Sequence, residues 1–193
     1  KNIRWNLSLN GTYYKNELTK LPSDKDPNGY QAGSYWRKLG GTLYNWYTYE
    51  WVGVDPTNGL PQYNKYVKDD DGNETIEIVN KTSDATLRDT GKSPFPDFYG
   101  GFSTTLNMYG FDLSAVFAYQ IGGYIMDSYY QALMSGGGEG ENWHTDIFNR
   151  WTPTNTITDV PRVQKESQVM NETSTRFLTS ASYLNLRNLT LGY

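Results

Sequence analysis

Residues Phe98–Gly122 read FYGGFSTTLNMYGFDLSAVFAYQIG and decide the fold class. Two runs of about ten residues, Tyr99–Met108 and Phe111–Gln120, flank the dipeptide Tyr109-Gly110, and the second run shows a period of two. This pattern predicts an antiparallel β-hairpin with a very short turn. Strands of this length are typical of transmembrane barrels, whereas soluble sheets more often use shorter ones. The hairpin therefore favours a barrel over a sandwich.

A further strand is predicted at Ile3–Asn10, where apolar side chains hold every odd position and polar side chains every even one. A period of two indicates a strand with one apolar face. The polar face is what the lumen of a barrel requires, but a half-solvated sheet on a soluble protein would show the same alternation. Both interpretations stay open for this strand taken alone.

An aromatic run follows a polar stretch. We expect Leu21–Tyr35 to be a loop and Trp36–Val54 to be a second strand. Its aromatic side chains would fall on both faces, which suits an interfacial girdle or the ligand-facing upper wall of a barrel; a packed aromatic sandwich core is the alternative. The side chains concerned are Tyr44, Trp46, Tyr47, Tyr49 and Trp51.

Turn-forming residues are dense in Gly53–Pro61, which predicts a tight connection before a short strand at Gln62–Val67. The acidic stretch Asp69–Asn73 invites comparison with a calcium loop. Its spacing does not match an EF-hand, in which glycine follows the third ligand and a glutamate closes the site. We therefore expect a solvated turn there and no metal site.

Residues 123–178 abandon the period of two, and a short helix is predicted at Tyr124–Ser135. A connection of more than fifty residues is too long for an ordinary loop and indicates a functional one. In a barrel, a loop of this length belongs on the extracellular side.

The last predicted strand, Ser182–Tyr193, alternates imperfectly. In a regular strand Leu184 and Leu186 would share one face, and Leu189 and Leu191 the other. We expect a β-bulge near Asn188, which would re-aim the side chains.

The amino-acid composition argues against several classes of function. A net charge of −4 without a basic run argues against nucleic acid, and the absence of cysteine removes disulfides, thiolate nucleophiles and Cys-ligated zinc. The single histidine, His144, lies close to Asp146 and Glu141, yet nothing else in the chain completes a triad or a metal site around it. No stretch of about 18 apolar residues predicts a membrane helix. We expect no enzyme activity and no cofactor.

Several segments, in collinear order, resemble the C-terminal barrel region of SusC/RagA-family proteins, the TonB-dependent outer-membrane transporters of Bacteroidetes. The matching residues are Tyr49–Gly59, Asp89–Pro96, Tyr99–Phe102, Phe111–Ser114, Tyr119–Gly123, Arg150–Asn155, Val160–Arg162 and Ser182–Tyr193. Residues 1–48 carry no sharp motif.

This resemblance implies an all-β fold of antiparallel strands that form part of a transmembrane β-barrel in the bacterial outer membrane. It also implies uptake of glycan fragments or peptides together with a SusD-like surface lipoprotein. TonB would act only through N-terminal parts that this sequence lacks. We expect residues 1–193 to be a barrel domain incomplete at both ends, with 123–178 as its long extracellular loop.

A barrel segment leaves two sheet edges unpaired. From roughly six expected strands, we predict an open sheet, a sheet folded onto itself, or edge pairing between copies. The alternative function is a soluble, secreted β-sandwich that binds carbohydrate through its aromatic side chains.

Candidate binding residues lie in the long loop. Aromatic side chains stack on sugar rings, which makes Tyr124, Tyr129, Tyr130 and Trp143 candidates for a ligand site. Trp151 is expected instead to anchor the loop to the barrel rim. The residues assigned a structural role within the family motifs are Gly53, Asp55, Pro56, Gly59, Trp151, Pro153 and Arg162.

Overall fold

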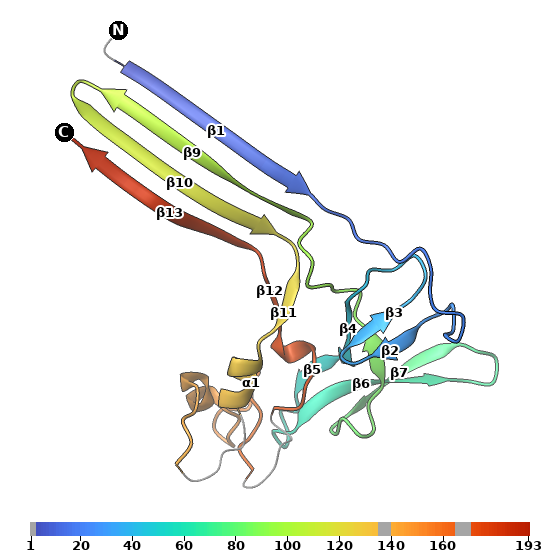
Figure 1. The fold of residues 1–193 in the computed structure, drawn as a ribbon. Coiled ribbons are helices and arrows are strands. Elements are labelled where there is room, and N and C mark those ends of the chain that lie inside the picture. Colours follow the sequence, from blue (N-terminus) through green and yellow to red (C-terminus); the bar gives the residue numbers. More distant parts are fainter. Residues whose placement is uncertain (1–2, 135–139, 165–170) are drawn as a thin grey trace.

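The computed structural model describes residues 3–134, 140–164 and 171–193. Its largest element is an antiparallel sheet of four long strands in the order β1 (Ile3–Tyr13), β9 (Phe98–Met108), β10 (Phe111–Ile121) and β13 (Tyr183–Gly192) (Figure 1). The all-β, antiparallel fold class is confirmed. The long strands number four, fewer than the roughly six expected, and the sheet is open.

The predicted hairpin is confirmed with its turn. Met108 pairs with Phe111, and the two residues between them, Tyr109 and Gly110, have positive φ angles of 52° and 88°. Positive φ at both central residues is the geometry of the two-residue turns that match the twist of paired strands. β9 and β10 therefore run side by side over their full length.

The four-stranded sheet has one apolar and one largely polar face, because directly paired residues point to the same side. The apolar face carries Ile3, Trp5, Leu7, Leu9, Tyr13, Phe98, Phe102, Leu106, Met108, Phe111, Leu113, Phe117, Tyr119, Ile121, Leu184, Leu186, Leu189 and Leu191. The other face carries Arg4, Asn6, Ser8, Asn10, Thr12, Tyr99, Ser103, Thr105, Asn107, Asp112, Ser114, Val116, Ala118, Gln120, Tyr183, Asn185, Asn188 and Thr190.

The predicted β-bulge in β13 is confirmed and explains the leucine pattern. Val116 pairs with Asn188, but the next residue of β10, Phe117, pairs with Leu186, so Arg187 is the extra residue. An extra residue reverses the alternation beyond it. All four leucines of β13 consequently lie on the apolar face.

The first loop, residues 14–97, contains two small sheets. One has the order β2 (Tyr30–Ala32), β3 (Tyr35–Arg37), β4 (Asn45–Tyr49) and β8 (Leu87–Asp89). The other has the order β5 (Trp51–Val54), β6 (Pro61–Lys68) and β7 (Glu74–Val79).

The second loop, residues 122–182, holds β11 (Tyr124–Met126), which pairs with β12 (Leu178–Ser180), and the helix α1 (Ser128–Leu133). The described residues of this loop also contain two 3₁₀ helices, η1 (Thr145–Asn149) and η3 (Thr175–Phe177). A buried cluster of Met134, Ile147, Val160 and Phe177 forms the core of this loop. No helix in the described ranges is long and apolar enough to span a membrane.

The prediction of one long strand at Trp36–Val54 is wrong. The run is divided into β3, β4 and β5, and the preceding stretch predicted as a loop contains β2. The division arises from partners distant in sequence: β4 pairs with β8, whereas β5 pairs with β6. These aromatic residues therefore belong to the loop and not to the wall of long strands.

The predictions of a short strand, a short helix and a turn are confirmed. The short strand at Gln62–Val67 is confirmed as β6, and the predicted helix is present but shorter, as α1, with β11 before it; Ser135 lies outside the described residues. The Asp69–Asn73 stretch is a turn in which the Asp69 carboxylate accepts hydrogen bonds from the backbone N–H groups of Asp71 and Asn73. Among described residues, no group of three potential metal ligands is assembled. The sandwich alternative fails because the long sheet stands as a single layer (Figure 1).

Candidate functional site

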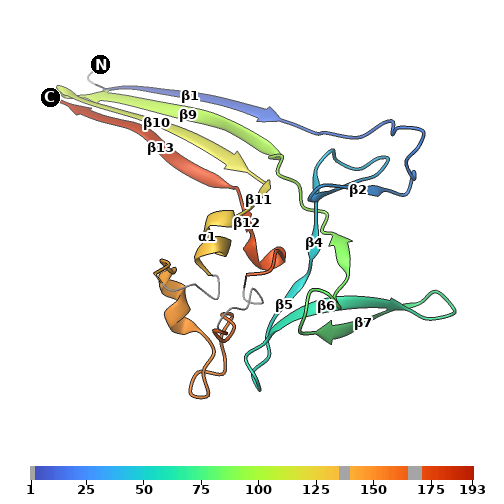
Figure 2. The same cartoon turned by 60° about the horizontal axis from the view of Figure 1, so that its bottom comes forward.

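Both loops leave the same end of the long sheet and lie against each other (Figure 2). The Trp46 indole N–H donates a 2.8 Å hydrogen bond to the Tyr124 carbonyl, and the Thr48 hydroxyl donates one of 3.1 Å to the Thr173 carbonyl. The backbone N–H of Trp51 donates a 3.0 Å bond to the Thr175 hydroxyl. The two loops, residues 14–97 and 122–182, are therefore joined into one unit at this end of the sheet.

A clamp formed by Trp151 and Arg162 of the second loop grips the turn at residues 55–59 of the first. The Trp151 indole N–H donates a 3.1 Å hydrogen bond to the Pro56 carbonyl. Arg162 donates twice, from its backbone N–H to the Gly59 carbonyl at 2.9 Å and from its guanidinium to the Asn58 carbonyl at 2.9 Å.

Gly59 is required at the centre of this clamp. Its φ is +74°, and a Cβ placed on it would stand 2.5 Å from the Trp151 ring. A side chain is thus excluded both by backbone conformation and by the ring. The structure brings together five of the seven residues expected to have structural roles: Asp55, Pro56, Gly59, Trp151 and Arg162.

Asp55 organises the turn that the clamp grips. Its carboxylate accepts hydrogen bonds from the Thr57 hydroxyl at 2.6 Å, the Thr57 backbone N–H at 2.9 Å and the Asn58 amide at 2.7 Å. These bonds, first of all that from the Thr57 hydroxyl, lower the pKa of Asp55. Gly53 lies at a register shift between β5 and β6, and Pro153 is exposed in the turn after Trp151.

Arg176 lies where the loops meet. Its guanidinium sits 5.0 Å from the ring centre of Trp51 in the first loop and 5.1 Å from that of Phe177 in the second. Burial lowers the pKa of Arg176 and raises that of the nearby Tyr63 phenol. The contacts identify Arg176 as a link between the loops that no sequence motif signalled.

The four candidate aromatic residues have different surroundings in the described part of the molecule. Tyr130 and Trp143 are half-buried against the core of the second loop, and Tyr124 lies under the Lys92 ammonium, 4.8 Å from its ring centre. Tyr129 is 86% exposed. Of the four, Tyr129 alone presents most of its side chain to solvent.

Tyr130 is held on both sides. Its hydroxyl donates a 2.9 Å hydrogen bond to the Asp146 carboxylate, and its ring packs edge-on against His144 and Phe177. Burial, followed by the hydrogen bond to Asp146, raises the pKa of Tyr130 to about 12. These contacts give Tyr130 a structural place in the second loop.

His144 and Asp146, considered above as an acid–base pair, lie close together. The His144 Nδ1 is 3.3 Å from the Asp146 carboxylate and accepts a 3.2 Å hydrogen bond from the Asp146 backbone N–H. A ring nitrogen that accepts from the backbone at this position caps the start of η1. The arrangement orders a helix end in the second loop.

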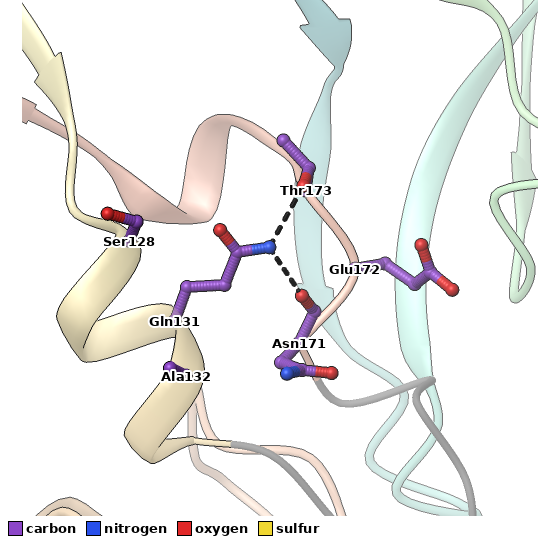
Figure 3. A pocket seen from close by; sticks show the side chains of 6 residues that line it. All are labelled: Ser128, Gln131, Ala132, Asn171, Glu172 and Thr173. Atoms are coloured by element: carbon purple, nitrogen blue, oxygen red, sulfur yellow. Dashed lines mark hydrogen bonds between the residues drawn. The ribbon is translucent and has the colours of Figure 1, made fainter.

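An open pocket of about 280 Å³ lies between α1 and residues 171–173 (Figure 3). The Gln131 amide spans it, donating hydrogen bonds of 2.7 Å to the Asn171 carbonyl and 2.9 Å to the Thr173 hydroxyl. Its lining residues are Ser128, Gln131, Ala132, Asn171, Glu172 and Thr173. Sequence reasoning missed all six, because these common residues form no motif and meet only after folding.

The sequence and the structure were compared with those of known proteins. No family model matches the chain. The TonB-dependent receptor P3 of Formosa agariphila is 29% identical over all of this chain and 20% of its own length. The TonB-dependent receptor SusC of Bacteroides thetaiotaomicron is 28% identical over all of this chain and 19% of its own length.

A solved structure is similar to this chain in fold as well as in sequence. A chain of the RagAB peptide importer in the closed-closed state matches with a TM-score of 0.77 and 29% identity, covering 99% of this chain and 21% of that one. The present chain spans about a fifth of the length of these relatives.

The single-layered sheet, with both loops at one end, thus has the architecture of part of a TonB-dependent receptor barrel. More particularly, the resemblance to SusC/RagA-type receptors expected from the sequence is confirmed over the whole chain.

Proposed function

We propose that this chain forms part of the wall, and two extracellular loops, of an outer-membrane TonB-dependent transporter that imports glycan fragments or peptides. The observation that carries the proposal is the division of all four long strands into an apolar and a largely polar face. A lipid-facing side and a water-facing lumen impose this division on a barrel wall.

Strand length and exposure support a membrane location. The long strands have 10 or 11 residues, which is the length that crosses the hydrocarbon layer when a strand is tilted. On the apolar face Leu9 is 71% and Leu191 is 74% exposed. A continuous apolar surface of this kind is suited to lipid rather than water.

Trp5 lies on the apolar face, and its indole N–H has a hydrogen-bond acceptor there. The Trp5 indole N–H donates a 2.8 Å hydrogen bond to the Thr104 hydroxyl on the neighbouring strand. An indole N–H left unpaired in hydrocarbon would be costly. Trp5 can therefore face lipid without an unsatisfied donor.

The partner in this proposal is a SusD-like surface lipoprotein docked on the loops. The second loop presents Phe148, 81% exposed, and Ile157, 91% exposed. Hydrogen bonds to the Asn149 carbonyl from the Asn155 amide and the Thr158 hydroxyl hold the two segments together. Large exposed apolar side chains on an ordered surface mark a protein interface. Transport with such a partner, and not catalysis, is the role proposed.

Single-cysteine labelling of the full-length parent in membranes tests the wall assignment. The sequence of this region contains no cysteine, so each introduced thiol is read alone. Cysteine at Leu113 or Leu191 should resist a water-soluble maleimide, whereas cysteine at the adjacent Ser114 or Thr190 should react. Free labelling of all four positions from water would refute a lipid-facing wall.

Dependence on TonB tests transport itself. Uptake of oligosaccharides and of peptides would be compared in cells with and without TonB. The proposal predicts that one class is taken up only when TonB is present. Equal uptake in both strains would contradict it.

A further inference from the structure

β7 has one edge that no strand covers in the described part of the chain. It is the last strand of the three-stranded sheet β5–β6–β7, so β6 pairs with one of its edges and the other edge is free. The pairing with β6 is regular, from Val79 opposite Tyr63 to Glu74 opposite Lys68. β7 is therefore a straight strand with its outer edge open over its whole length.

The backbone groups at this outer edge belong to Ile76 and Ile78. The Asn64 N–H donates to the Glu50 carbonyl at 3.0 Å, and the Asn64 carbonyl accepts from the Thr86 N–H at 3.2 Å, so both groups of Asn64 point away from β7. The residue opposite such a position in an antiparallel ladder also directs its N–H and C=O outward. Ile78 lies opposite Asn64, and Ile76, two residues earlier, points the same way. Neither backbone has another hydrogen-bond partner among the described residues.

The side chains of the same two residues are apolar and exposed. Ile76 is 58% and Ile78 is 57% exposed, and both lie on one face of β7. Natural edge strands are usually protected from pairing by lysine, proline or a bulge. β7 has none of these, and its two glutamates are already paired with basic side chains at 2.7 and 2.8 Å. The edge therefore favours pairing with a further strand.

The hairpin of β6 and β7 lies on the side of the first loop that is away from the second loop (Figure 1, Figure 2). The second loop joins β10 to β13 at one side of the wall, whereas β1, at the other side, has an unpaired edge among the described strands. A closed barrel places another strand of the same protein along this edge of β1. That strand reaches the end of the wall from which both loops leave, so the loop it carries emerges beside the first loop.

The full-length receptor offers enough chain to supply the missing strand. This chain covers 21% of the matched RagAB chain, so about four-fifths of that relative lies outside the matched region. A segment of the same polypeptide is held near β7 at a high effective concentration. A ligand or a separate protein would leave the isoleucines and the free backbone groups exposed whenever it was absent, and such an edge promotes aggregation. These arguments favour a segment of the receptor itself.

We propose that an extended strand from the neighbouring extracellular loop of the full-length receptor pairs with the outer edge of β7. Its backbone bonds to the N–H and C=O groups of Ile76 and Ile78, and its apolar side chains cover the two isoleucines. The β5–β6–β7 sheet thereby gains a fourth strand. The inference rests on the proposed barrel wall, because the wall places that loop next to β7.

Residue-resolved amide hydrogen exchange of the purified full-length receptor, without lipoprotein or ligand, tests the pairing. The N–H groups of Ile76 and Ile78 should exchange at least about tenfold more slowly than in an unstructured peptide. Thr75 and Glu77, whose N–H groups point to β6, are the internal controls and should be protected with or without a fourth strand. Fast exchange at Ile76 and Ile78 overturns the proposal. Protection that appears only when a lipoprotein or a peptide is added overturns the choice of occupant.

Photo-cross-linking of the same receptor identifies the occupant. Irradiation of the Ile78→benzoylphenylalanine variant should join position 78 to a segment of the same polypeptide outside residues 1–193, mapped by mass spectrometry. Asp70→benzoylphenylalanine, in the exposed turn of the hairpin, is the control and should cross-link to that segment less. A product of doubled mass would assign the edge to a second copy and overturn the proposal. Cross-links confined to residues 1–193, or none at all, also overturn it.

Failure of this pairing is distinguishable from failure of the wall assignment. If Ile76 and Ile78 exchange fast while cysteines at Leu113 and Leu191 resist the maleimide, the pairing fails and the wall stands. If all four wall positions are labelled from water, the wall assignment fails whatever the exchange rates of β7.

Discussion

The hydroxyl of Tyr119 donates a 3.0 Å hydrogen bond to the backbone carbonyl of Asn10, although β9 lies between their two strands. The ring can cross because Gly100 of β9 has no side chain beneath it. A Cβ at Gly100 would stand 2.9 Å from the Tyr119 hydroxyl and would clash with the Asn10 carbonyl. One phenol thereby links β10 to β1 across β9 on the apolar face.

Removal of this tie should weaken the sheet. Tyr119→Phe loses the hydrogen bond and should lower the free energy of unfolding by about 1 kcal/mol. Gly100→Ala also forces β1 away from β9 and should cost about 1–3 kcal/mol. Urea unfolding of the full-length receptor in lipid vesicles measures both. Ser103→Ala, on the polar face of the same strand, is the control and should change little; a Gly100→Ala variant as stable as wild type would refute the close packing.

Two deletions in β13 should have opposite outcomes. Deletion of Arg187, the extra residue, joins Leu186 directly to Asn188, so the leucines alternate regularly with polar residues and all stay on the apolar face. Deletion of the paired residue Asn185 instead turns Leu184 to the polar face. We expect the folded receptor to be retained in the first variant and reduced in the second, measured by heat-modified gel mobility. Loss of the folded receptor on deletion of Arg187 alone would contradict its assignment as the extra residue.

The clamp predicts a difference between two glycine substitutions. Gly59 and Gly72 both have positive φ, +74° and +82°, but only Gly59 has the Trp151 ring against it, and no atom lies within 4 Å of a Cβ at Gly72. Gly72→Ala should cost about 1–2 kcal/mol from backbone strain alone. Gly59→Ala adds overpacking of about 1–3 kcal/mol and should separate the loops. Limited proteolysis of the receptor in membranes should cut the loops faster in Gly59→Ala than in Gly72→Ala, and equal rates would contradict the clamp.

The raised pKa of Tyr130 predicts that the second loop loses stability at alkaline pH. Its pKa in the folded protein is about 12, above the ordinary value of about 10. Between these values the unfolded loop loses the proton while the folded loop keeps it, so the contribution of Tyr130 to stability is complete below about pH 10 and is lost as the pH rises toward 12. Protease resistance of the loop should fall over this window, and Tyr130→Phe should show a smaller fall.

Tyrosinate absorbance would distinguish ionisation of Tyr130 from general alkaline unfolding of the receptor. The difference between wild-type and Tyr130→Phe spectra isolates the Tyr130 phenol from all other tyrosines of the receptor. It should titrate near pH 12. Titration near pH 10 would show that Tyr130 is neither buried nor bonded to Asp146.

The wall could be predicted from the sequence because its determinants are local. The hairpin follows from two alternating runs around Tyr109-Gly110, and the bulge follows from four leucines in the wrong phase within one strand. Alternation is visible wherever one face must be apolar throughout. These features needed no knowledge of distant partners.

The loops could not be predicted in the same way. The aromatic run at residues 36–54 divides because β4 pairs with β8, about forty residues away, and aromatic β-formers carry no sign of where one strand ends. The pocket joins α1 to residues 171–173 through ordinary polar side chains. Arg176 gave no signal either, since its partners Trp51 and Phe177 come from different loops.

The two halves of the clamp differ in the groups they contribute, and this difference determines how strongly the two halves should co-vary among homologues. The second loop contributes the Trp151 indole and the guanidinium and backbone N–H of Arg162, and all of these meet main-chain carbonyls, those of Pro56, Asn58 and Gly59. Every residue has a carbonyl, so the residue at position 56 can change without altering the contact, whereas Asn58 is held by the bond from its amide to Asp55. Among homologues position 56 and the two residues of the second loop should therefore show little co-variation, and methods that infer proximity from correlated substitutions should overlook a junction held by hydrogen bonds.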